Sequence, residues 1–83
     1  MSDLQNALDL YRDGRMLVDR TRDIAVRHDE LRWMREDLEE ALLDLKLGVI
    51  ELNPERVLRS SIEVTSLIVS IVDWILEHGD LGE

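Results

Sequence analysis

Two histidines are the first side chains in this 83-residue sequence that are able to bind a metal or carry a proton. His28 precedes Asp29 and Glu30, and His78 follows Glu77. A di-iron bundle uses Glu-x-x-His pairs, and a zinc site needs three or four converging ligands, whereas neither histidine has ligands at such a spacing. Because the chain also has no cysteine, we expect no metal and no cofactor, with both histidines as surface or cap residues. His78 is then a cation favoured by the C-terminal end of a helix.

A run of carboxylates between Glu36 and Asp44 is the second candidate, either as paired acids or as a cation-binding face. Glu36 and Glu40 share one side of a helix, as do Asp37, Glu40 and Asp44. The leucines and the alanine that alternate with these acids form the stripe that we expect to be buried, so the acids should face solvent. The sequence also has no glycine-rich phosphate loop, nucleophile elbow or Cys/His pair. We therefore expect no catalytic residues and no enzyme activity.

The net charge of the chain limits the classes of molecule that it is expected to bind. A formal net charge of −9 disfavours direct binding to nucleic acid or to an anionic membrane, since both attract basic surfaces. The same charge supports an alternative function as an acidic inhibitor, of the kind found in phages, that imitates DNA toward a nucleic-acid-handling protein. Nine arginines, seven of them between positions 12 and 35, lie among the acids and would interrupt the continuous negative strip that such a mimic needs.

The elements that must position these residues are helices, because the sequence is rich in Leu, Glu, Asp, Arg and Ile and has a single proline. Ser2 with Gln5 has the form of a capping box, which predicts a helix from Asp3. Asn53 followed by Pro54 predicts the start of the last helix, with Asn53 as the N-cap. Gly48 and Gly79 suit helix C-caps, which gives a first region over 3–47, a connection over 48–53 and a last helix over 54–78.

A seven-residue spacing of leucine and isoleucine runs through the first region and is typical of a coiled-coil seam. Its members are Leu10, Leu17, Ile24, Leu31, Leu38, Leu45 and Leu52. We favour one long, straight or kinked helix over two helices, although His28-Asp29-Glu30 is a possible turn with Asp29 as N-cap. A continuous helix would be about 68 Å long at 1.5 Å per residue and would need another copy of the chain to pack against. In the alternative, the N-terminal helix folds back as a third helix.

The last helix is apolar on more than the usual stripe of about 100°. One broad face runs from Val57 to Ile75, and a second set from Leu58 to Leu76 wraps much of the remainder. One antiparallel neighbour covers only one of these faces, so we expect two hairpins to complete a bundle. The residues predicted to form the interface are Leu31, Trp33, Met34, Leu38, Leu45, Ile62, Leu67, Ile68, Val69, Ile71, Trp74 and Leu76.

The stretch from Val57 to Ile68 resembles the second helix of the small aspartyl-phosphate phosphatases of sporulation relays, which carry a Ser-Gln-Glu-Leu-Asp signature. Ser61 and Glu63 match its first and third positions, and Val64 stands at the fourth. The resemblance implies an antiparallel helical hairpin and a phosphatase-like regulator of response regulators as a further alternative. The essential aspartate of the signature is Thr65 in this sequence, which places the phosphatase activity in doubt.

Together these patterns predict a single all-α domain over residues 1–83, an antiparallel hairpin or small bundle with a long N-terminal helix, completed by oligomerisation. The N-terminus lacks the basic and apolar regions of a signal peptide, and no apolar stretch reaches the roughly 20 residues of a membrane span, so we expect a cytoplasmic protein. The function that we expect is a non-catalytic regulatory, adaptor or structural protein that associates with itself, and with a second protein in some settings.

Overall fold

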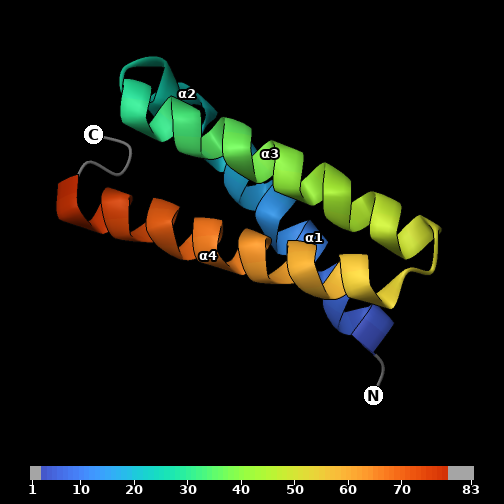
Figure 1. Ribbon diagram of the computed structural model, residues 1–83. Helices are drawn as coiled ribbons and strands as arrows, with labels where there is room; N and C mark the ends of the chain where they lie inside the picture. Colours follow the sequence, from blue (N-terminus) through green and yellow to red (C-terminus); the bar gives the residue numbers. More distant parts are fainter. Residues whose placement is uncertain (1–2, 79–83) are drawn as a thin grey trace.

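The computed structural model describes residues 3–78, and these residues fold into helices without any strand (Figure 1). The helices are α1 (Asp3–Arg20), α2 (Arg22–Val26), α3 (Asp29–Ile50) and α4 (Pro54–His78). The prediction of an all-α fold is therefore confirmed. The capping box at Ser2 and the C-cap at Gly79 fall outside the described residues.

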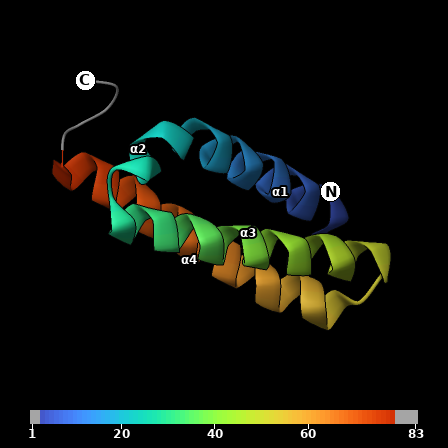
Figure 2. The same ribbon diagram turned by 90° about the horizontal axis from the view of Figure 1, so that it is seen from above.

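Three of the helices form a small bundle. α3 and α4 lie side by side and run in opposite directions, and α1 crosses one side of this pair (Figures 1 and 2). The start of α1 lies at the end of the bundle where α3 connects to α4, while the short α2 lies at the opposite end (Figure 2). Consequently α4 has one side packed against α1 and α3 and another side that no element within residues 3–78 covers.

The chain turns back between α2 and α3, so the interpretation of residues 3–47 as one continuous helix is wrong. His28 adopts an extended conformation (φ −137°, ψ 108°) and occupies the N-cap position of α3, one residue before the Asp29 that the two-helix alternative placed there. Asp29 is instead the first helical residue and forms an ion pair with Arg32. The fold-back alternative, with the N-terminal segment as a further helix, describes the observed structure.

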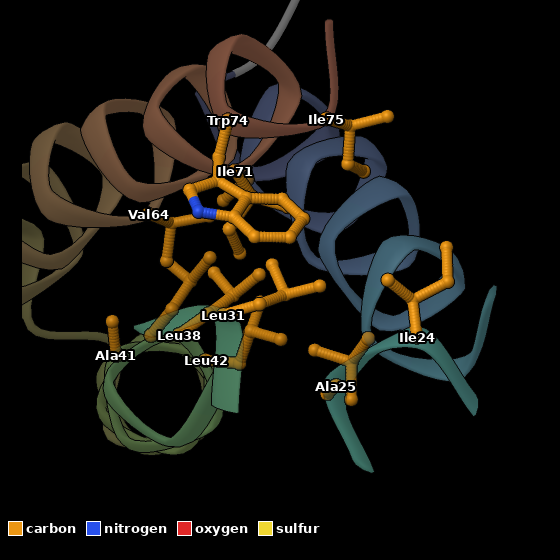
Figure 3. Packing of buried hydrophobic residues seen from close by; sticks show 13 residues of the cluster. Ile24, Ala25, Leu31, Leu38, Ala41, Leu42, Val64, Ile71, Trp74 and Ile75 are labelled. Carbon is orange, nitrogen blue, oxygen red and sulfur yellow. The ribbon is translucent and has the colours of Figure 1, made fainter. Parts of the chain in front are cut away.

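Folding back is favoured because it buries the heptad leucines against the same chain. Leu31, Leu38 and Leu45 are fully buried, and Figure 3 shows Leu31 and Leu38 within the core. Val64, Ile71 and Trp74 of α4 contribute to the same cluster, and Leu10 and Leu17 of α1 pack against it. Each such side chain stabilises the fold by about 1.5–3 kcal/mol when it is fully buried. The seam from Leu10 to Leu45 therefore contributes to an intramolecular core, whereas its last predicted member, Leu52, is exposed.

Two polar contacts fix the N-terminal segment on α3. The guanidinium of Arg35 donates from Nε and Nη2 to the carbonyl oxygen of Val18, at 3.0 and 2.8 Å. That carbonyl lies in the last turn of α1, where helix carbonyls lack partners within the helix.

The close approach of α1 and α3 depends on a glycine nearer the middle of α1. A Cβ on Gly14 would lie 2.7 Å from Leu42 Cδ2. Glycine at this position thus permits the close approach of α1 and α3.

The connection between α3 and α4 differs from the prediction in one respect. Gly48 does not end the helix: α3 continues to Ile50, and Gly48 is buried inside it, where a Cβ would lie 3.1 Å from Val57 Cγ2. The helix ends through Leu52, which has a positive φ of 54°. Asn53 N–H donates to the Gly48 carbonyl at 3.0 Å, and Leu52 N–H donates to the Val49 carbonyl at 3.1 Å, which is a Schellman motif.

The predicted start of α4 is confirmed. Asn53 Oδ1 accepts a hydrogen bond from the Arg56 backbone N–H at 3.2 Å, so Asn53 is the N-cap before Pro54. The Arg56 side chain then ties the connection together, because it donates to Asp44 Oδ1 at 2.6 Å and to Glu51 Oε1 at 3.0 Å. These hydrogen bonds, the one to Asp44 above all, raise the pKa of Arg56 and keep it protonated.

Candidate interaction surface

An apolar row runs along the side of α4 that none of the other described helices covers. It consists of Leu58, Ile62, Thr65, Val69, Val72 and Leu76, which we call the outer α4 stripe. All six side chains are exposed, and the five apolar ones expose between 40% and 68% of their surface. Single exposed leucines or isoleucines are common on protein surfaces, whereas contiguous exposed apolar patches mark sites of interaction.

The spacing of the outer α4 stripe is that of a helix-pairing seam. Successive members are four, three, four, three and four residues apart. This alternation keeps a row of side chains on one side of a helix and is the a/d pattern by which two helices pack knobs into holes. At 1.5 Å per residue the stripe is about 27 Å long, which is most of the length of α4.

The stripe is uncovered because the opposite side of α4 meets the rest of the chain. Ser60, Val64 and Ile71 are fully buried there, and Trp74 and Ile75 are nearly so. Figure 3 shows Trp74 and Ile71 projecting from α4 toward the leucines of α3. Since helical side chains two residues apart point in very different directions, burial of Ile71 leaves Val69 outside.

The predicted interface residues fall into three groups. Leu31, Leu38, Leu45, Ile71 and Trp74 are buried within the chain, Met34, Leu67 and Ile68 are partly buried against the core, and Trp33, Ile62, Val69 and Leu76 are exposed. The fold therefore separates the heptad leucines of α3 from the exposed residues of α4. Only the third group lies on the surface of this fold, and three of its members belong to the outer α4 stripe.

Leu58 and Val72 belong to the stripe but were not among the predicted interface residues. Their signal is present in the sequence as the alternating spacing from Leu58 to Leu76. The prediction combined residues from both apolar faces of the last helix with the seven-residue leucine seam of the first region. Which of two apolar faces on one helix is covered depends on where α1 folds back, and this is not visible in the sequence of α4.

The two histidines come together with one tryptophan at the end of the bundle near α2. The His78 ring stacks on the Trp74 indole with centroids 3.8 Å apart, and the His28 ring meets the same indole edge-on at 4.9 Å. Trp74 Nε1 donates to Glu30 Oε1 at 3.0 Å, and His78 Nδ1 lies 2.8 Å from the Trp74 carbonyl oxygen. The sequence analysis did not predict this cluster. Among the described residues, no three His, Asp or Glu side chains converge as a metal site requires.

Most acids of the predicted run lie on the outward side of α3: Glu36, Asp37, Glu39 and Glu40 are exposed, and Leu38 between them is buried. Asp44 departs from the prediction, because it is half-buried and pairs with Arg56 of α4. A shallow groove between α3 and α4 is lined by Glu40 and Asp44 from α3 and by Arg56 and Glu63 from α4. Because the groove is open and Arg56 in it pairs with Asp44, it offers no enclosed pocket for a small molecule.

Ion pairs interrupt the negative charge of the N-terminal segment. Arg12 pairs with Asp9 at 2.6 Å, and Arg15 and Arg22 both lie 3.8 Å from Asp19.

None of the helices in the described part of the chain combines the length and the hydropathy needed to cross a membrane. No protein-family model matches the chain, and no curated protein or solved structure is significantly similar to it.

Proposed function

We propose that this protein is a non-catalytic helical interaction module that associates with a second copy of itself through the outer α4 stripe. The observation that carries the proposal is the exposure of five apolar side chains at helix-pairing spacing on one side of α4. Their burial between two copies would stabilise the assembly, since apolar area removed from water contributes roughly 25 cal/mol per Å². A regulatory, adaptor or structural role, in which the assembled protein presents its acidic α3 surface to another protein, fits this arrangement.

Neither alternative function has an observation of comparable weight. An acidic mimic of DNA needs a continuous negative strip, and the ion pairs of Arg12, Arg15 and Arg22 interrupt the charge of α1. A hairpin phosphatase needs a carboxylate where α4 has Thr65, and that threonine lies in the middle of the apolar stripe.

A pair of substitutions tests the proposal. Val69 on α4 and Leu43 on α3 are similarly exposed, at 53% and 56%. Val69→Asp places a carboxylate from each copy inside the proposed interface, so it should weaken self-association at least about 100-fold, because an unpaired buried charge is costly. Leu43→Asp adds the same charge outside the interface and should leave the association constant within about threefold.

Sedimentation of both variants beside the unaltered chain gives the dissociation constants, and circular dichroism at the same concentrations checks that each variant remains helical. Equal weakening by both variants would mean that the apolar surface of the whole hairpin, or net charge alone, controls association. An unchanged mass for Val69→Asp would remove the outer α4 stripe from the interface.

A further inference from the structure

The charges beside the outer α4 stripe indicate how a second copy would be oriented, an inference that rests on the proposed function. Arg59 and Asp73 are exposed and lie on the same edge of the stripe, each one residue after a stripe member, Leu58 and Val72. Neither side chain forms an ion pair within residues 3–78, although six other ion pairs are present there. Each therefore has a charge that is available to a neighbouring molecule.

From this arrangement we propose that two copies pair α4 against α4 in antiparallel orientation about a twofold axis near Ser66. In that arrangement the stripe faces itself in complete layers: Leu58 opposite Leu76, Ile62 opposite Val72, and Thr65 opposite Val69 of the second copy. Each of these layers mixes the two kinds of seam position, as antiparallel coiled-coil packing requires. The pairing is isologous, so every layer occurs twice and the assembly closes as a dimer.

Charge complementarity selects the antiparallel orientation. With the layers above, Arg59 of one copy lies beside Asp73 of the other, and symmetry repeats the pair at the far end of the interface. The residues that flank a seam set partner choice and orientation through such pairs. In a parallel arrangement with the stripe in register, Asp73 would instead lie beside Ile68 of the second copy and Arg59 beside Pro54, and neither charge would find a partner.

The middle of the stripe also suits a close crossing at the axis. Ser66 and Ser70 are small and exposed, Thr65 and Val69 form the central layers, and larger side chains lie toward both ends of the stripe. Ser66 of one copy would meet Ser66 of the other on the axis. Small side chains at the centre permit two helices to approach each other closely, while the leucines and isoleucine at the ends fill the wider spacing as the helices diverge.

A charge exchange tests the orientation separately from self-association. Arg59→Asp and Asp73→Arg each convert two attractive pairs into two repulsive ones, so each should raise the dissociation constant about tenfold or more at low ionic strength. The double variant Arg59→Asp/Asp73→Arg restores two attractive pairs and should bind within about twofold of the unaltered chain. Arg20→Asp, on the exposed side of α1, changes the net charge equally and should have little effect.

Cross-linking provides a second readout, because the sequence has no cysteine of its own. A mixture of Arg59→Cys and Asp73→Cys chains should cross-link with a short bis-maleimide into the mixed dimer, in preference to either homodimer. A dominant homodimer of each variant would overturn the antiparallel orientation, as would a double variant that stays as weak as the single ones. An unaltered chain that is monomeric would instead remove the proposed function on which the inference rests.

Discussion

α3 and α4 form one antiparallel pair, and the outward sides of both helices are exposed. The outward side of α3 is mainly acidic, whereas that of α4 is mainly apolar. On α3, the carboxylates from Glu36 to Glu40 separate the exposed Trp33 from a short apolar run of Leu43, Leu47 and Ile50, in which Leu47 is half-buried. On α4, five apolar side chains follow one another without an interrupting charge. Isolated exposed apolar residues are normal on a protein surface, whereas a continuous row is not. Arrangement, more than exposure, thus separates the two surfaces.

The comparison extends to the two sides of α4 itself. The inner side is covered by α1 and α3, while the outer side has the same aliphatic character and no cover within residues 3–78. Substitutions on the inner side of α4 should therefore change the stability of the fold, and substitutions on its outer side should change self-association. Substitutions on the outer side of α3 should change neither property.

The largest effect is expected for Ile71→Asp. Ile71 is fully buried, and a carboxylate without a partner at this position should lower the free energy of unfolding by several kcal/mol. Circular dichroism during urea titration should show loss of the cooperative transition or a much lower midpoint. Val69→Asp, two residues away, is the matched control and should retain a cooperative transition at concentrations where the chain is monomeric. Equal unfolding by both variants would show that α4 has no distinct outer side.

An intermediate effect of opposite sign is expected for Leu52→Gly in the connection between the two helices. Leu52 has a φ of 54°, which is costly for a side chain with a Cβ, and 78% of its surface is exposed. Glycine adopts this conformation readily, so the substitution should stabilise the fold by about 1 kcal/mol. Since Leu52 lies outside the outer α4 stripe, the dissociation constant should not change. The midpoint of thermal unfolding checks the first expectation, and a lower midpoint would contradict it.

The smallest effect is expected for Glu40→Ala on the outward side of α3. Glu40 is exposed and forms no ion pair among the described residues, so the free energy of unfolding should change by less than about 0.5 kcal/mol. Chemical denaturation measures this change. A large destabilisation would indicate that the acids of α3 hold the bundle together, and the contrast between the two outward sides would fail.

The sequence predicted those elements whose signals are local. Asn53 followed by Pro54 identified the first turn of α4, because capping depends on residues that are adjacent in the chain. The alternation of acids and leucines in α3 likewise identified its buried and solvated sides. These features depend on helix geometry alone, which is why they could be predicted without knowing the partner of each helix.

The features that the sequence analysis missed depend on contacts between distant residues. The turn at His28 lacks glycine and proline, and its stability comes from contacts such as the one between Arg35 and Val18. Gly48 was interpreted as a helix end, whereas its role is the close approach of Val57. The heptad leucines were assigned to a second copy of the chain because the fold-back that buries them is not encoded in their spacing.

Self-association through the outer α4 stripe is tested first by the solution mass of the unaltered chain, measured by light scattering across a dilution series. We expect a mass of twice the 9.7 kDa chain that persists at micromolar concentration and falls toward one chain at high dilution. A mass of a single chain throughout the series, with the helical circular dichroism retained, would contradict it.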